Sequence, residues 1–245
     1  MNTICNRRSI RKYSEKDVTN DTLYQLLELA ERTQTMGNLQ LYSVVITRDK
    51  EMKQKLAPAH FNQPMVTGAP VVLTFCADFR RTSDWAENRK AQPGYENFLS
   101  FINAASDTLL YCQTFCNLAE EAGLGLCYLG TTVYMPKAII ETLQLPRLVF
   151  PIATITVGWP DENPPLSDRL PLKAIIHQET YQSYTPEMID EYYGVKEALE
   201  ENKHFVKINH KETLAQVFTD IRYTQKDNEV MSEGMIAALK QQGFL

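Results

Sequence analysis

No proline or glycine occurs between Tyr95 and Gly123, and this stretch constrains the fold of the 245-residue chain more than any other. The apolar residues recur at helical spacing: Phe98, Phe101, Ile102, Ala105, Leu109, Cys112, Cys116 and Ala119. The spacing predicts a single long central helix. A helix that is apolar over most of its circumference must be buried on several sides. Either the core of a monomer or a dimer interface would bury it.

The composition describes a chain that can bury a substantial core. With 44% hydrophobic residues it can form one large domain, or one domain with an appendage. The formal net charge of -5 disfavours nucleic acids and anionic membranes as partners, because neither would be attracted to the average surface. No apolar run approaches the roughly 20 residues of a membrane span, and the N-terminus lacks an apolar core of signal-peptide length. We therefore expect a cytoplasmic protein with small-molecule partners.

The cysteines do not form the pattern of a disulfide framework. Their number, 5, is odd, and they are widely spread and mostly embedded in apolar sequence, which favours buried, reduced thiols. Cys112 and Cys116 share a predicted helix face, but no histidine or second cysteine pair lies near them. Core packing is the better interpretation of this pair, and we expect no metal site.

Periodicity and turn residues divide the chain into elements. A capped helix is predicted from residue 19 to about 33, and strands are predicted over 41–47 and 70–77, both in the sheet interior. A turn and short strand over 123–131, a helix over 136–143 and a strand over 148–157 follow. After a proline-rich, extended excursion, helices are predicted over 186–201, 212–224 and 229–242. The whole chain, 1–245, is expected to form a single domain with a helical C-terminal extension over about 186–245.

An arginine-dense run, Arg7-Arg8-Ser9-Ile10-Arg11, lies near the start of this acidic chain. Guanidinium groups remain ionised and present several donors in a planar fork, which suits a phosphate dianion. Ser9 adds a short neutral donor. The run is equally compatible with a solvated basic turn before the first helix.

Several segments, taken together in this order and at this spacing, resemble the FMN-dependent nitroreductase superfamily over about residues 5–185. These segments are the run at 7–11, Phe75-Cys76-Ala77-Asp78-Phe79, Gly123-Leu124-Gly125, Tyr128-Leu129-Gly130, Gly158-Trp159-Pro160 with Asn163-Pro164, and Arg169-Leu170-Pro171. The resemblance is greatest to the branch of oxygen-insensitive NAD(P)H nitroreductases and NAD(P)H:flavin oxidoreductases.

The resemblance implies an α+β fold, with a mostly antiparallel sheet surrounded by helices, in a homodimer that holds FMN at the subunit interface. It implies two-electron transfer, in which NAD(P)H reduces the flavin and a nitroaromatic, a quinone or a free flavin takes the electrons. Because the cofactor carries this chemistry at its N5 atom, no catalytic side chain is expected.

The resemblance also assigns cofactor-binding residues. For the phosphate these are Arg7, Arg8, Ser9, Arg11 and, from the far end of the proline-rich excursion, Arg169. For the flavin ring they are Gln63 and the turn Tyr128, Leu129, Gly130 and Thr131, where glycine lets a backbone amide approach N5. Thr35 and Gly37 match a segment that the partner subunit contributes.

Each assignment has a purely structural alternative. Gln63 would serve in a solvated turn, Gly130 would end a strand, and Arg169 would pair with Asp161, Glu162 or Asp168. Trp159 is interpreted as a packing residue rather than a substrate contact.

The chain departs from the family pattern in four places. Arg7 stands where relatives often have histidine, Ser167 replaces a lysine, and the segment between 33 and 40 is not serine-rich. In the fourth place, relatives selective for NADPH carry an arginine-rich loop, but this chain has glutamates followed by Lys203, Lys207, His210 and Lys211. This mixture leaves the choice between NADH and NADPH open. A flavin storage or delivery protein, and a specialised flavin-dependent dehydrogenase or dehalogenase, are the alternative functions.

Overall fold

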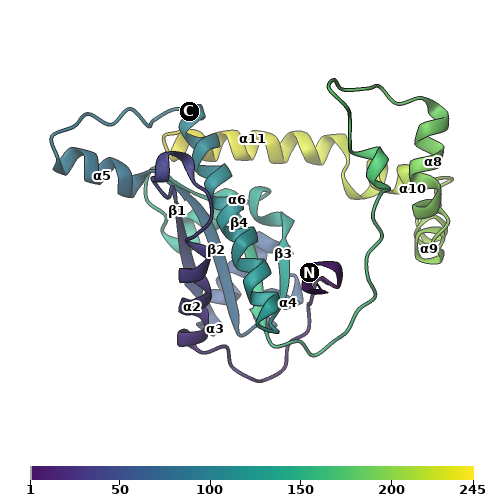
Figure 1. Ribbon diagram of the computed structural model, residues 1–245, viewed down its shortest axis with the longest axis horizontal. Coiled ribbons are helices and arrows are strands. Elements are labelled where there is room, and N and C mark those ends of the chain that lie inside the picture. The colour runs from purple at the N-terminus through teal and green to yellow at the C-terminus, as the bar shows by residue number, and fades with distance from the viewer. Residues whose placement is uncertain (1) are drawn as a thin grey trace. The chain divides into compact units, whose positions relative to one another are not determined.

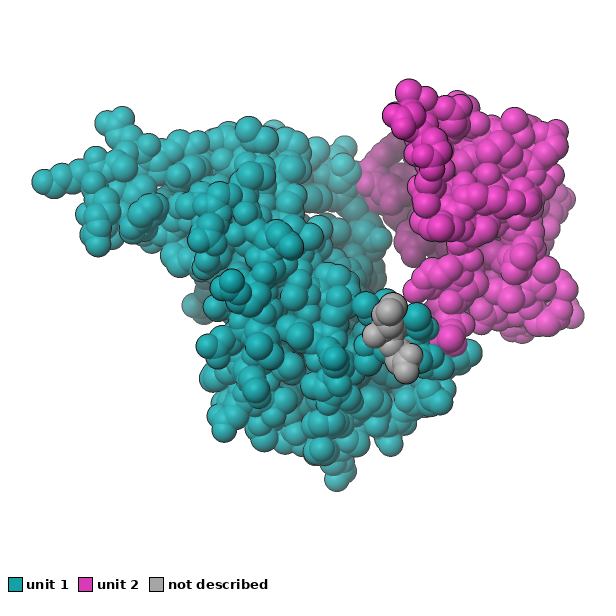
Figure 2. Space-filling model, viewed as in Figure 1, with its two compact units in different colours: residues 1–165, 231–245 teal, residues 166–230 magenta. Residues whose placement is uncertain are grey.

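The computed structural model describes residues 2–245, which fall into two compact units. The first unit consists of the chain up to residue 165 together with 231–245, and the second consists of residues 166–230, as Figure 2 shows. The expectation that the whole chain acts as one FMN-binding domain remains a prediction.

The first unit is built on an antiparallel sheet, so the predicted α+β class is confirmed. In the described residues its four strands lie in the order β1-β2-β4-β3 (Figure 1). The strands are β1 (Tyr42–Thr47), β2 (Val71–Asp78), β3 (Gly125–Leu129) and β4 (Val149–Gly158). Every residue of β2 and β4 is buried, because these strands lie inside the sheet. The expectation of an interior strand over 41–47 was wrong, since β1 lies at an edge and is half-buried along most of its length.

The predicted long helix is α6 (Phe98–Glu121), which contacts all four strands. Its inward face packs into the main core, with Tyr111, Cys112, Phe115 and Ala119 among the strand side chains. The opposite face leaves large apolar side chains in contact with solvent: Phe98, Leu99, Ile102, Leu109 and Leu110. The sheet therefore buries one side of this helix and leaves a second apolar side uncovered within this chain.

Among the other helices of the first unit, the one over 20–30 packs against α6 and the one over 136–143 packs against β4. The helices are α1 (Asn2–Cys5), α2 (Asn20–Ala30), α3 (Lys50–Leu56), α4 (Pro64–Gly68), α5 (Arg80–Asn88) and α7 (Pro136–Leu143), with short turns η1 (Met36–Asn38), η2 (Ala57–His60) and η3 (Gly130–Val133). The predicted helix over 136–143 is confirmed, and the first predicted helix ends at Ala30. Helices α3 and α5 were not predicted, because their apolar residues are too few to mark a face.

The arginine-dense run belongs to an extended segment, residues 7–19, that we call the N-terminal strap. Ser9 bridges Leu126 of β3, and the Ile10 amide donates to the Leu126 carbonyl at 2.8 Å. The Tyr13 hydroxyl donates to the Ile10 carbonyl at 2.6 Å. The strap therefore lies directly against the β3 edge of the sheet.

Two glycines permit this close approach. Gly125 and Gly158 are paired across β3 and β4. A Cβ atom on Gly125 would lie 2.8 Å from the Ile10 side chain, and one on Gly158 would lie 2.6 Å from the Tyr13 ring and 2.8 Å from Pro70. Only glycine leaves room for the strap here.

Alanine at position 158 should therefore lower the free energy of unfolding by about 2 kcal/mol, because rigid rings surround the added methyl group. The matched control is Gly94→Ala, where a Cβ atom would meet nothing within 4 Å. Urea titration followed by circular dichroism measures both variants. A Gly158→Ala protein as stable as the parent would show that the strap does not pack here as described.

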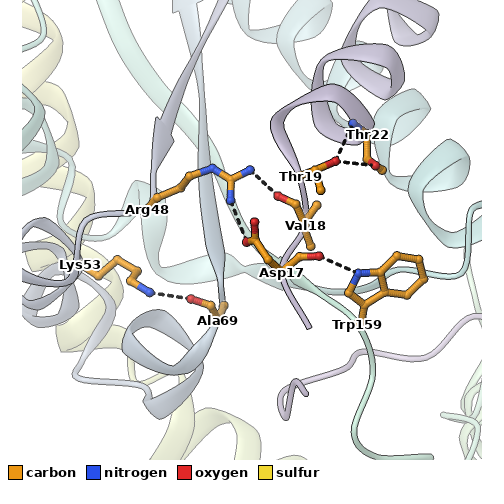
Figure 3. Close-up of polar contacts among 8 residues, drawn as sticks. All are labelled: Asp17, Val18, Thr19, Thr22, Arg48, Lys53, Ala69 and Trp159. Carbon is orange, nitrogen blue, oxygen red and sulfur yellow. Dashed lines mark hydrogen bonds and ion pairs between the residues drawn. The ribbon is translucent and has the colours of Figure 1, made fainter. Parts of the chain in front are cut away.

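The rest of the strap is fixed by contacts that Figure 3 shows. The Trp159 indole N–H donates to the Asp17 carbonyl at 3.1 Å, and the Arg48 Nη2 donates to the Val18 carbonyl at 2.5 Å. The Thr19 hydroxyl caps α2 by accepting from the Thr22 amide at 3.2 Å. Trp159 also packs against the main core, in agreement with its interpretation as a packing residue.

The second unit is helical, but its boundaries differ from the predicted ones. It contains η4 (Leu172–Ala174), α8 (Pro186–Glu197), α9 (Glu200–Ile208), α10 (Leu214–Val217) and the π-helical turn η5 (Phe218–Arg222). The single helix predicted over 186–201 was wrong, because the backbone turns extended at Leu199. The Asn202 side chain donates to the Lys196 carbonyl at 2.7 Å, and this hydrogen bond links α9 to the last turn of α8 across the break. The last helix, α11 (Gln225–Gln241), begins four residues before its predicted start at 229.

None of the described helices is long and apolar enough to cross a membrane. Four cysteines are buried as predicted, and Cys5 is exposed. Among the described residues, no group of three or more histidine, cysteine, aspartate or glutamate side chains is arranged to hold a metal ion.

Candidate functional site

The guanidinium groups of Arg7 and Arg8 are already engaged by protein acceptors. Arg7 Nη1 lies 3.7 Å from Glu120 Oε1 on α6. Burial raises the pKa of Glu120, and the Arg7 charge opposes that rise. Arg8 Nε donates to the Pro164 carbonyl at 2.7 Å, and its Nη1 donates to the Asn6 carbonyl at 2.7 Å. Arg7 thus ties the strap to α6, and Arg8 ties it to the segment at Pro164.

Arg11 differs from these two arginines. Its side chain is exposed and reaches Cys127 of β3, whose pKa is raised by burial and lowered by the Arg11 and Arg7 charges. Among the residues that the structure describes, its guanidinium forms no ion pair, whereas its backbone amide donates to Glu162 Oε1 at 2.5 Å. Side chains alternate along an extended segment, so Ser9 and Arg11 share one face of the strap. Arg11 is therefore the strap arginine with the most freedom to bind an anion.

A cavity of about 290 Å³ lies beside the strap. Arg7 and Arg8 line it with Gly125, but so do the carboxylates of Glu120 and Glu162. The structure thus brings two of the predicted arginines together, in a cavity where two acidic groups offset their charge.

The four residues at the end of β3 divide into buried and open positions. Leu129 is buried, whereas Tyr128 is 49% exposed. A Cβ atom on Gly130 would meet nothing within 4 Å, so the backbone there is open to a ligand. Thr131 is buried and its hydroxyl lies 2.9 Å from Nδ1 of His60. This turn offers an exposed aromatic side chain and an uncovered glycine side by side.

Gln63 is the N-cap residue directly before α4, next to the same part of the sheet. Ala59 and Met65, on either side of it in sequence, pack with Cys127 and Leu129 in one apolar cluster. Gln63 is half-buried, and its backbone N–H donates to the His60 carbonyl at 3.2 Å. The structure therefore places the Gln63 loop on the face of β3 to which Cys127 and Leu129 point.

Sequence reasoning missed His60. The ring is fully buried, and within residues 2–245 no protein atom hydrogen-bonds its Nε2 atom. Burial lowers the pKa of His60 to about 4, so the ring is neutral near pH 7. A single histidine between Ala59 and Phe61 carries no sequence signal for such a position.

Sequence reasoning also missed Asp107, which fixes the segment that contains Thr35 and Gly37. This buried carboxylate on α6 accepts from the Met36 amide at 2.9 Å and from the Leu41 amide at 3.3 Å. Gly37 has φ +57°, which favours glycine there. Thr35 is half-buried and Gly37 is exposed. The segment is anchored on one side and open on the other, but its contact with a partner subunit remains a prediction.

Arg169 belongs to the second unit, where its side chain is exposed. Its Nη1 donates to the Asp168 carbonyl at 2.7 Å, and the Asp168 carboxylate binds Lys196 Nζ at 3.0 Å. Among the described residues of its own unit, Arg169 forms no ion pair. Its convergence with the strap arginines on one phosphate remains a prediction.

The basic group after residue 200 is partly neutralised within the second unit. Lys203 pairs with Glu200 at 2.8 Å, and Lys211 pairs with Asp220 at 2.9 Å. A surface with these pairs carries less net positive charge than its lysine content suggests.

Comparison with known proteins identifies relatives along most of the chain. The model of the nitroreductase family matches residues 4–159. An FMN reductase (NAD(P)H) from Bacillus subtilis (strain 168) is 34% identical over 184 residues, which cover 73% of either chain. An oxygen-insensitive NADPH nitroreductase from Salmonella typhimurium is 29% identical over 189 residues, which cover 77% of either chain. A solved structure of a Bacteroides fragilis NCTC 9343 protein assigned as an oxidoreductase is 62% identical, covers 100% of both chains and gives a TM-score of 0.99.

Proposed function

This chain belongs to the nitroreductase family, and from that premise we propose that it is an FMN-dependent enzyme that uses NAD(P)H to reduce nitroaromatics, quinones or free flavins. The relatives named as an FMN reductase and a nitroreductase support this activity. When bound, FMN supplies the two-electron chemistry by taking a hydride from the nicotinamide and passing it to the acceptor.

One arrangement of the chain carries the proposal. The Arg11 guanidinium, which forms no ion pair in the described residues, meets β3 at Cys127, and the open turn at Gly130 follows three residues later. Because β3 rises about 3.3 Å per residue and the turn begins directly after Leu129, these two points are at most about 10 Å apart. That separation suits a ligand with a phosphate at one end and a planar ring at the other.

The residues present fit FMN. A guanidinium without a carboxylate partner among the described residues, such as that of Arg11, suits a phosphate dianion, and Arg169 offers another in its own unit. The uncovered backbone at Gly130 suits close approach of a ring edge, and Gln63 has an amide that both donates and accepts. We assign phosphate binding to Arg11 and Arg169, with Arg7, Arg8 and Ser9 around them. We assign the ring to Gln63 and the turn from Tyr128 to Thr131.

The visible absorption spectrum of the desalted protein, with the extracted chromophore identified, tests the proposal first. Stoichiometric FMN whose visible band disappears on anaerobic addition of NADH or NADPH is the expected result. A colourless protein that takes up no added FMN would contradict the site. Tightly bound FMN that neither nucleotide reduces would instead support a storage or delivery protein.

We also propose that the enzyme is a homodimer. The uncovered apolar face of α6, with Leu99, Ile102 and Leu109, supports a second copy as its cover, because a monomer would leave these side chains in water. The anchored segment at Thr35 and Gly37 would then reach the FMN of the partner. Sedimentation equilibrium should give twice the mass of the 28.1 kDa chain, and a monomer at micromolar concentration would contradict the dimer.

A further inference from the structure

His60 occupies a position where a histidine is energetically unfavourable. The ring is fully buried beside the apolar cluster that contains Leu56, Ala59 and Met65, and Nε2 has no protein partner in residues 2–245. A buried polar nitrogen without a hydrogen bond costs about 1–3 kcal/mol. An apolar side chain would pack there without that cost, so packing alone does not account for a histidine.

The polar contact of His60 joins two distant segments of the chain. Its Nδ1 atom and the Thr131 hydroxyl share a hydrogen bond of 2.9 Å, which links η2 to η3. A second contact follows at once, because the Phe61 ring lies 6.4 Å from the Tyr134 ring just beyond η3. The two turns are thus held together at two consecutive points.

Both turns lead to residues assigned to the flavin ring. Thr131 directly follows Gly130, and Gln63 lies three residues after His60. Between His60 and Gln63 the backbone passes through two left-handed residues, Phe61 with φ 55° and Asn62 with φ 53°. Such conformations cost roughly 1–3 kcal/mol each and persist only where the surroundings hold them. The position of Gln63 therefore depends on how firmly His60 is held.

We propose that His60 is a positioning residue that fixes the Gln63 loop to the Gly130 turn through its hydrogen bond with Thr131, and so sets the affinity and the reduction potential of bound FMN. The inference rests on the proposed function. The low pKa of His60 agrees with it, because a ring that stays neutral near pH 7 keeps the same hydrogen bond.

Two substitutions separate positioning from packing. His60→Leu fills the site but removes the hydrogen bond, so the unfolding free energy should stay within about 1 kcal/mol of the parent value. His60→Asn leaves space around a smaller side chain, which should cost about 1–2 kcal/mol, but its amide keeps a polar atom near the Nδ1 position. If His60 positions the loop, His60→Leu should bind FMN more weakly than His60→Asn, although His60→Leu is the more stable protein.

The measurements are the FMN dissociation constant by fluorescence quenching, the flavin midpoint potential and urea unfolding. For His60→Leu we expect about a tenfold higher dissociation constant and a more negative potential. For His60→Asn we expect a dissociation constant within about twofold of the parent value and an unshifted midpoint potential. Thr131→Val should reproduce the His60→Leu values, and Thr131→Ser should keep the parent values. If His60→Leu does not fold, a Thr131→Val variant with unchanged FMN affinity and potential overturns the inference.

Two results would overturn the inference while the proposed function stands. One is a parent that binds and reduces FMN together with a His60→Leu or Thr131→Val variant of unchanged affinity and potential. The other is a loss of affinity that follows stability, with His60→Asn worse than His60→Leu, as packing would predict. A parent that takes up no FMN would overturn both the function and the inference.

Discussion

Alanine at Arg169 or at Arg11 is expected to raise the FMN dissociation constant about 100-fold, while the protein stays folded. Charge-assisted hydrogen bonds from a guanidinium to a phosphate contribute roughly 1.5–3 kcal/mol each, and two such bonds from one arginine account for a factor of this size. Both side chains are exposed, and neither forms an ion pair within the described residues of its own unit. Their removal therefore costs little protein structure.

Matched lysines serve as controls for this experiment. Lys12 neighbours Arg11 on the strap, and Lys173 lies four residues after Arg169, where it pairs with Glu191. Alanine at either lysine changes the net charge by the same amount and should alter FMN affinity less than about threefold, because exposed charges at a distance are screened. Equilibrium dialysis of FMN measures all four variants. A folded Arg169→Ala protein that binds FMN as tightly as the parent would show that the phosphate site is misassigned.

The sequence predicts the elements whose patterns are strong and local. The helix over 98–121 is long and uninterrupted, and the strands at β2 and β4 are continuous apolar runs, so their burial follows from composition. Residues 41–47 look the same in sequence, yet β1 lies at an edge, because strand order depends on contacts between distant segments. Periodicity does not encode the break at Leu199, where the Asn202 side chain bonds the Lys196 carbonyl across the change of direction.

The candidate site was predictable where a family motif marks it and unpredictable where one side chain supports another. The arginines of the strap form a motif, but only the structure separates Arg11 from Arg7 and Arg8, which carboxylate and carbonyl groups already engage. Asp107 accepts a hydrogen bond from the backbone amide of Met36, and His60 shares one with the hydroxyl of Thr131. In both cases the partner is far away in the sequence. Neither belongs to a motif, because their positions depend on the folded geometry.

Burial of His60 should also make stability depend on pH between about 6.5 and 4. The pKa of this ring falls from 6.5 in the unfolded chain to about 4 in the folded one, and desolvation is the cause. Between these values the unfolded state binds a proton that the native state does not, so the unfolding free energy falls as the pH is lowered. The two pKa values give a loss of about 3 kcal/mol by pH 4.

Carboxylates titrate in the same range, so the effect of His60 must be measured as a difference between proteins. Urea unfolding of the parent and of His60→Leu from pH 7.5 to 4 should give curves that start within about 1 kcal/mol of each other, after which the parent loses about 3 kcal/mol relative to the variant by pH 4, because the variant lacks this proton-binding difference. His204→Leu, the same change at an exposed position of α9, is the matched control. Curves for His60→Leu that run parallel to the parent would mean that the buried ring takes up its proton in the folded state as readily as in the unfolded one.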